Sequence, residues 1–273
     1  MLQQKLAYPP NRIVAEVKMS LIKTSEEVIC RCALCVGQSV FPFDGDDGVP
    51  EQSEFGIVSN KTLDTLLSCN HLKKKDLVVF VGGFLDGLFC CMLKLAKEYY
   101  KLNPQQDIWY ATHDSAKQLR KIVQSYNNAG KKVVLIGHSW GGDTAAYLLR
   151  NNQDIRADLL VTFDPVSKKG APAKTENMGK WVNIFVDYEI SRNHHSNLLA
   201  KIGGPWKNAK NADINITQQE WGKLPLESDQ KKMTRKELNE LHHSDVYWMF
   251  FCKKLAAVWK EILPESILTC DIN

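Results

Sequence analysis

Short apolar runs, separated by segments with helical periodicity, constrain the fold of this chain more than any other feature. Each run is apolar at most positions, as strands of a parallel sheet are when helices cover both faces. The runs are LVVFV (77–81), DIWYATH (107–113), VVLI (133–136), LLVTF (159–163) and VNIFV (182–186). Helical patterns lie between them at 88–100, at 114–129 and from about Gly142. The alternation predicts an α/β fold with a mostly parallel central sheet and helices on both faces.

The residues before this core have weaker patterns. Residues 12–19 and 28–36 alternate loosely, as two opening strands do, and residues 41–56 are rich in turn formers and predict a surface loop. The second of these strands contains a tight group of cysteines, Cys30, Cys32 and Cys35. No second pair of cysteines or histidines follows at the spacing of a zinc finger, so buried strand cysteines are favoured over a metal site.

The residues after the core include a long polar segment. Residues 189–240 form a polar excursion with a short strand near 212–217, and this excursion is a candidate lid or cap. A last helix is expected from Ser244, with an inward face formed by Val246, Met249 and Phe250. With 44% hydrophobic and 24% charged residues, the composition is that of a globular protein, and residues 1–273 fit a single domain.

Charge and hydropathy exclude several classes of function. The net charge of +4 is too small to favour a nucleic-acid partner, which requires a concentrated basic face. No stretch approaches the about eighteen apolar residues of a membrane span, and the N-terminal segment lacks the apolar region and cleavage site of a secretory signal. We therefore expect a protein that is cytoplasmic where it is made, with its eight cysteines in a reducing compartment.

One strand leads into a serine surrounded by small residues. The segment VVLIGHSWGGDTAAYLL (133–149) is a β-branched run, then G-H-S-W-G, then a helical pattern. This order is that of a nucleophile elbow, in which a strained turn between strand and helix exposes a serine above the carboxyl edge of the sheet. The helix that follows favours the negative charge that develops during acyl transfer. The motif predicts that Ser139 is a nucleophile.

A serine nucleophile needs an acid and a base, which follow it in the order Ser, acid, His in this architecture. Two acids end strands after Ser139: Asp164 follows LLVTF, and Asp187 follows VNIFV. Either of them satisfies the chain order.

Two pairs of histidines follow Ser139 in the sequence. His194 and His195 come directly after the strand 182–186, too early for a base that is carried past the last strand. His242 and His243 lie where the chain enters the last helix. Because Ser244 can cap that helix while His243 stays in the loop, His243 is favoured over His242 as the base.

Acyl transfer also needs two backbone N–H donors for the oxyanion. One is expected from Trp140, directly after the nucleophile. The other is expected from Phe84, because the glycines of FVGGFLDG (80–87) open the backbone after an earlier strand.

Several segments resemble known lipases of the α/β-hydrolase superfamily. GGFLDG (82–87) resembles the H-G-F-x-D oxyanion segment of the pancreatic-type lipases, in which the Phe amide is a donor, although Gly82 stands where those lipases have His. TFDPV (162–166) is similar to their G-L-D-P segment, in which the Asp is the acid of the triad. The resemblance covers about residues 77–165; it implies an α/β-hydrolase fold and favours Asp164 over Asp187.

A second resemblance concerns small bacterial hydrolases. LIGHSWGGDTAA, DPVS and SNLLAKIGGPW are similar to segments of these proteins. Some related lipases are exported without a signal peptide as interbacterial phospholipase effectors. This resemblance implies a lipid substrate and an export route that needs no signal peptide.

Together these features predict a serine carboxylester hydrolase of acyl lipids, a lipase or phospholipase. Ser139, Asp164 and His243 would form the triad, and the amides of Phe84 and Trp140 the oxyanion hole. No metal or organic cofactor is required, and transient contact with a membrane surface is expected. The sequence does not identify protein partners. The alternatives are a soluble short-chain esterase or thioesterase, and a non-catalytic binding protein with the same fold.

Overall fold

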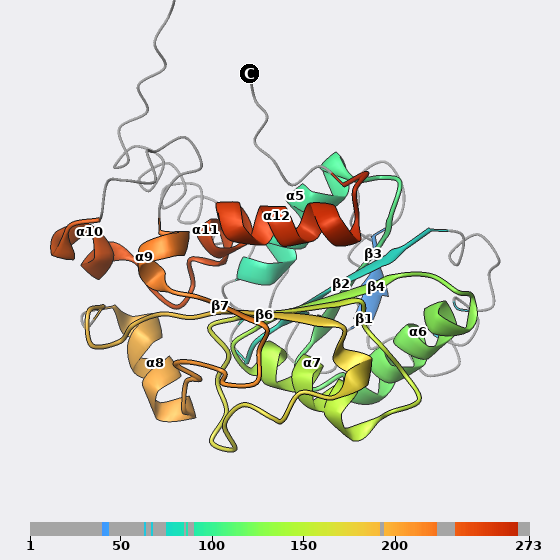
Figure 1. The fold of residues 1–273 in the computed structure, drawn as a ribbon, viewed down its shortest axis with the longest axis horizontal. Coiled ribbons are helices and arrows are strands. Elements are labelled where there is room, and N and C mark those ends of the chain that lie inside the picture. Colours follow the sequence, from blue (N-terminus) through green and yellow to red (C-terminus); the bar gives the residue numbers. More distant parts are fainter. Residues whose placement is uncertain are drawn as a thin grey trace, which may run out of the picture.

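The central element of the protein is one twisted sheet with helices on both sides (Figure 1). The computed structural model describes residues 40–43, 63, 67, 75–84, 86, 90–191, 194–222 and 233–266. Within these residues, seven strands follow the order β1-β3-β2-β4-β5-β6-β7. They are β1 (Val40–Pro42), β2 (Leu77–Gly82), β3 (Asp107–Thr112), β4 (Val133–His138), β5 (Leu159–Phe163), β6 (Lys180–Ile184) and β7 (Ile214–Ile216). β1 is antiparallel to β3, and the other pairs are parallel.

Each face of the sheet is covered by its own set of helices (Figure 1). One face packs against α5 (Cys91–Leu102), α11 (Val246–Phe250) and α12 (Lys253–Ile262), and the other against α6 (Ala116–Asn128) and α7 (Trp140–Asn151). Alternate side chains of β2 enter the two cores: Val78 and Phe80 pack on the α5 side, and Val79 on the α7 side. Burial on both faces explains why these strands are apolar at successive positions. The predicted α/β fold class is confirmed.

Some element boundaries differ from the sequence prediction. The edge strand β1 occupies the start of the expected 41–56 loop, because Phe41 is buried and pairs with Tyr110 of β3. β4 continues to His138, and α7 begins at Trp140, directly after Ser139. The expected last helix is divided into α11 and α12, because Cys252 between them has an extended backbone (φ −68°, ψ 144°). The expected strands at 12–19 and 28–36 and the Cys30 group lie outside the described residues.

The polar segment 189–240 contains more helix than its composition predicts. It holds α8 (His195–Gly203), α9 (Gln218–Trp221) and α10 (Arg235–Glu240), together with β7; a short 3-10 turn, η4 (Glu176–Met178), precedes β6. α9 and α10 both begin with capping boxes, Thr217 with Glu220 and Thr234 with Glu237. These T-x-x-E signals are visible in the sequence and explain both helix starts.

No helix in the part of the chain that the structure describes is long and apolar enough to cross a membrane. The described cysteines differ in their bonding. Cys90 is disulfide-bonded, whereas Cys91 and Cys252 are not in disulfides. Burial raises the pKa of the Cys252 thiol to about 11, so this residue is an unreactive part of the core.

Candidate active site

Ser139 lies on the strained turn that joins β4 to α7. Its φ of 56° and ψ of −127° belong to a region that side chains with a Cβ rarely adopt. The turn also lies tightly against β2, because a Cβ on Gly141 would come within 2.2 Å of the Val81 carbonyl oxygen. The turn formed by G-H-S-W-G therefore requires a residue without a side chain where its backbone touches β2.

Asp164 follows β5, the neighbour of β4, and is fully buried. Its Oδ2 accepts a hydrogen bond from Nδ1 of His243 at 2.6 Å, and its Oδ1 accepts one from the Val186 amide at 3.0 Å. Because a carboxylate only accepts, the imidazole carries its proton on Nδ1. The lone pair of His243 Nε2 is then available to a substrate or to a serine hydroxyl.

The backbone of His243, in the loop between α10 and α11, is held from two sides. Its N–H donates to Asn197 Oδ1 in α8 at 2.8 Å. Its carbonyl oxygen accepts a hydrogen bond from Nε2 of His138 at 2.8 Å, and the two imidazole rings lie 4.4 Å apart. Burial and the neighbouring His243 lower the pKa of His138 well below its usual value, so His138 stays neutral.

The alternative acid and base make other contacts. Asp187 accepts a hydrogen bond from the Glu189 amide at 3.0 Å and thereby fixes a turn after β6. His242 Nε2 lies 3.2 Å from Asp245 Oδ1, and the His242 ring is stacked on His194 at 3.7 Å. Of the candidates weighed from the sequence, Asp164 and His243 are the acid and the histidine that the structure joins.

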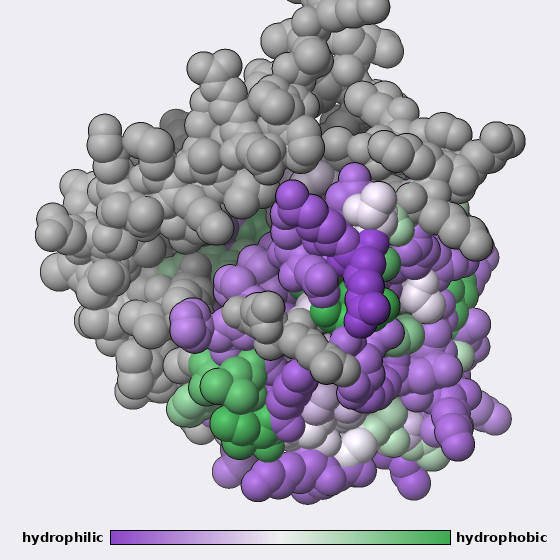
Figure 2. All heavy atoms as spheres, turned by 90° about the vertical axis from the view of Figure 1, so that its left-hand side faces the viewer, coloured by the Kyte–Doolittle hydropathy of each residue, from purple (hydrophilic) through white to green (hydrophobic). Residues whose placement is uncertain are grey.

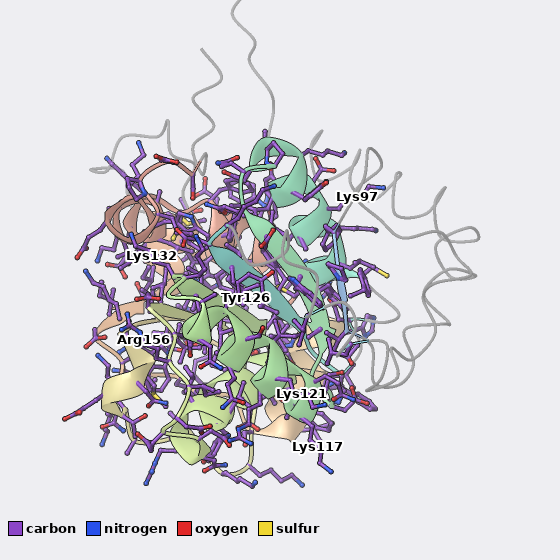
Figure 3. The ribbon with its side chains drawn as sticks, turned by 90° about the vertical axis from the view of Figure 1, so that its right-hand side faces the viewer. Lys97, Lys117, Lys121, Tyr126, Lys132 and Arg156 are labelled. Carbon is purple, nitrogen blue, oxygen red and sulfur yellow. The ribbon has the colours of Figure 1, made fainter. Side chains whose placement is uncertain are left out.

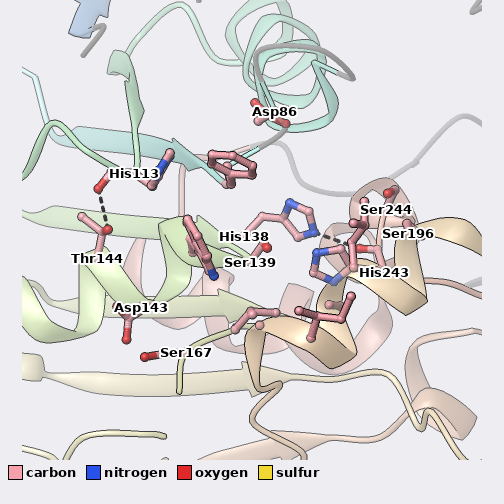
Figure 4. Close-up of a pocket in the computed structure, with 18 of the residues that line it drawn as sticks. Asp86, His113, His138, Ser139, Asp143, Thr144, Ser167, Ser196, His243 and Ser244 are labelled. Atoms are coloured by element: carbon pink, nitrogen blue, oxygen red, sulfur yellow. Dashed lines mark hydrogen bonds between the residues drawn. The ribbon is translucent and has the colours of Figure 1, made fainter. Parts of the chain in front are cut away.

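A cavity of about 520 Å³ opens above Ser139 (Figure 4). Ser139 and His243 both line it, and its surface is mostly apolar, with contributions from Phe84, Trp140, Leu199 and Ile202. Among the residues that the structure describes, no hydrogen bond joins Ser139 Oγ to His243. Such bonds are often long without substrate and shorten in the reacting complex.

The loop after β2 lies directly against the serine. A Cβ on Gly83 would come within 2.7 Å of the Ser139 Cβ, so the backbone of this loop is in contact with the elbow. The ring of the next residue, Phe84, is tilted by 47° against the Trp140 ring, with 4.9 Å between the ring centroids. In the described part of the chain, the backbone N–H groups of Phe84 and Trp140 donate no hydrogen bond. Neither N–H group is therefore used by another acceptor among the described residues.

Asp86 fixes this loop to the rest of the fold. Its Oδ1 accepts from the Met92 amide of α5 at 2.8 Å, and its Oδ2 accepts from the Tyr110 hydroxyl of β3 at 2.7 Å. Burial raises the pKa of Asp86. The aspartate of the GGFLDG segment thus connects the Phe84 loop to the first turn of α5 and to the sheet.

Sequence reasoning missed a residue that contacts both Asp164 and His243. The Tyr188 hydroxyl donates to Asp164 Oδ2 and lies 3.3 Å from His243 Nδ1. The sequence gives one indication of its role: Tyr188 is next to Asp187, and it follows a strand that ends near Asp164. The described residues contain no group of three or more His, Cys, Asp or Glu side chains arranged for a metal ion.

The strand order, the antiparallel edge strand and the serine between β4 and α7 define an α/β-hydrolase fold. The sequence matches no protein-family model and no curated protein. Two solved structures are similar to this chain. TT1662 from Thermus thermophilus has 10% sequence identity and a TM-score of 0.34, with 68% of this chain and 90% of that chain covered. A protein described as a predicted CIB-like hydrolase from Thermoplasma acidophilum has 12% identity and a TM-score of 0.27, with 66% and 88% covered.

Proposed function

We propose that this protein is a serine carboxylester hydrolase that acts on acyl lipids. The observation that carries the proposal is the buried hydrogen bond between Asp164 and His243, together with the cavity that His243 and the strained Ser139 both line. A carboxylate and an imidazole held in this way provide the base that a serine hydroxyl needs.

In the proposed reaction, Ser139 Oγ attacks the ester carbonyl while Nε2 of His243 takes the hydroxyl proton. Asp164 stabilises the imidazolium, and the amides of Phe84 and Trp140 donate to the oxyanion. The C–O bond then breaks, and His243 gives its proton to the departing alcohol. Water, activated by the same imidazole, cleaves the acyl-enzyme to the carboxylic acid and restores Ser139.

The surroundings of the cavity favour a lipid over a small soluble ester. Among the described residues, seven large hydrophobic side chains are exposed; four of them line the cavity, and Leu198 lies beside them on α8. In Figure 2, the side of the molecule on which α8 lies has a compact hydrophobic patch with hydrophilic surface next to it. Lys168 and Lys169 line the same cavity and fit an anionic headgroup. Exposed apolar patches of this kind are typical of protein–membrane or protein–protein contacts.

Substrate preference tests this proposal directly. We expect the purified protein to release fatty acid from phospholipid vesicles, and to cleave long-chain p-nitrophenyl esters faster than acetate esters, because a long chain fills the apolar cavity. The measurements are titration of released fatty acid and absorbance of nitrophenol. Hydrolysis restricted to short soluble esters or thioesters would instead support the esterase alternative, in which α8 has no contact with lipid.

Membrane contact is testable without catalysis. We expect the combined replacement of Leu198, Leu199 and Ile202 by serine to lower binding to anionic vesicles by about tenfold or more, because these side chains are 59%, 50% and 66% exposed and would be buried in lipid. Sedimentation with phosphatidylglycerol vesicles, in a Ser139→Ala background, measures the bound fraction.

A matched control uses the exposed hydrophobic residues away from the cavity. Leu102 and Tyr247 are 43% and 53% exposed, and neither is among the described residues that line the cavity. Replacing both by serine should leave vesicle binding unchanged. Equal binding by the α8 variant and the parent protein would show that this helix is not the lipid contact.

A further inference from the structure

One oxygen of the candidate triad acid accepts two hydrogen bonds. Asp164 Oδ2 accepts from Nδ1 of His243 and also from the hydroxyl of Tyr188. We propose that Tyr188 is a positioning residue, and that its hydroxyl orients Asp164 and limits the negative charge that the carboxylate presents to His243. This inference rests on the proposed function, because it concerns how the same three residues work.

The three polar groups form a closed triangle inside the protein. Tyr188 follows β6 and is almost completely buried, and its hydroxyl oxygen lies 3.3 Å from His243 Nδ1 as well as within hydrogen-bond distance of Asp164 Oδ2. The other carboxylate oxygen, Oδ1, accepts from the Val186 amide. Both oxygens of Asp164 are therefore held by the short segment 186–188, which fixes the plane of the carboxylate against the imidazole.

The protonation states of this triangle follow from its surroundings. Burial and the nearby Asp164 raise the pKa of Tyr188, so its hydroxyl remains protonated. Its proton points to the carboxylate, which can only accept. The Nδ1 proton of His243 then faces two acceptors, Asp164 Oδ2 and the lone pair of the Tyr188 oxygen. This arrangement favours the tautomer that leaves Nε2 free.

The second hydrogen bond also affects how Asp164 interacts with His243. A carboxylate that already accepts from a hydroxyl has less negative charge left to stabilise an imidazolium. Removing the hydroxyl should therefore strengthen the stabilisation of the imidazolium by Asp164. It should also loosen the orientation of Asp164, since one of its anchoring bonds is lost.

Other titratable groups near the triangle are unchanged by that replacement. His138, at the end of β4, is neutral and faces the His243 ring. From α8, the Nζ of Lys201 lies 5.9 Å from the centre of the Tyr188 ring. His242 and Asp245, whose Nε2 and Oδ1 atoms lie 3.2 Å apart, are in the same loop as His243. A change in the pH profile of Tyr188→Phe can therefore be assigned to the loss of the hydroxyl.

The test is the Tyr188→Phe variant. We expect the acid limb of kcat/KM against pH, measured on a soluble p-nitrophenyl ester, to move up by about half a pH unit to one unit. The plateau value of kcat should fall by about three- to tenfold, because the imidazole is less well oriented. In a Ser139→Ala background, the histidine C–H resonance of His243 should titrate at a correspondingly higher pH in NMR spectra.

Tyr126→Phe is the matched control. Tyr126 of α6 (Figure 3) is also buried and donates to a carboxylate, Asp107 Oδ2, at 2.9 Å. Neither Tyr126 nor Asp107 is among the described residues that line the cavity. Loss of the Tyr126 hydroxyl should lower thermal stability without moving the pH profile or the His243 titration. If Tyr188→Phe behaves in the same way, Tyr188 is a packing residue and the inference is wrong. The NMR titration decides this even if the wild-type protein hydrolyses no ester, so failure of the inference and failure of the proposed function are separable.

Discussion

Replacement of Ser139 by alanine is expected to lower ester hydrolysis by about a millionfold, the order of loss seen when a triad nucleophile is removed. The change deletes one oxygen atom from the cavity and leaves the strained backbone of the elbow in place. Thermal unfolding should therefore stay close to that of the wild type. Hydrolysis of a p-nitrophenyl ester and covalent labelling by a fluorophosphonate probe measure the effect.

A second cavity serine provides the control for labelling. Ser167 also lines the cavity, but it follows β5 and is not part of the turn between β4 and α7. The Ser167→Ala variant should still react with the fluorophosphonate, whereas Ser139→Ala should not. Undiminished hydrolysis in Ser139→Ala would disprove the mechanism. Absence of labelling in well-folded wild-type protein would favour a non-catalytic binding protein with this fold.

The features that the sequence predicts well are local ones. Each central strand is recognisable because burial on both faces requires apolar side chains at successive positions. The elbow is recognisable because its backbone comes so close to β2 that Gly141 has no room for a Cβ. The Phe84 loop is recognisable for the same reason, since Gly83 lies against Ser139. Requirements of this kind restrict which residue types are possible at a position, so they can be recognised in the sequence.

The contacts that the sequence does not predict are long-range ones. Asp164 and Asp187 both end strands at the same edge of the sheet, and chain order alone does not separate them. Their roles differ because Asp164, with a φ of 40°, is buried beside His243, whereas Asp187 fixes a local turn. Tyr188 was missed for a related reason: a buried tyrosine is an ordinary core residue until its hydroxyl partner is known.

Because Asp164 contacts His243 and Asp187 does not, replacing each acid by asparagine should affect catalysis very differently. We expect Asp164→Asn to lower kcat/KM by about ten-thousandfold, as the corresponding change does in other serine triads. Both oxygens of Asp164 accept hydrogen bonds: Oδ2 from Tyr188 and His243, and Oδ1 from the Val186 amide. In the asparagine variant, an N–H₂ group that cannot accept replaces one of these oxygens. An N–H₂ group facing His243 would favour the tautomer with its proton on Nε2. That nitrogen could then no longer accept the proton of Ser139.

Asp187→Asn is the matched control, because it makes the same chemical change after the adjacent strand. Asp187 accepts its hydrogen bond from the Glu189 amide, and an asparagine oxygen can accept that bond equally well. Its kcat/KM should therefore stay within about twofold of the wild-type value. Steady-state rates on a soluble ester, with thermal unfolding of both variants, measure the contrast. A large loss in Asp187→Asn with little change in Asp164→Asn would assign the acid to Asp187. It would also require His243 to leave its observed partner in the working enzyme.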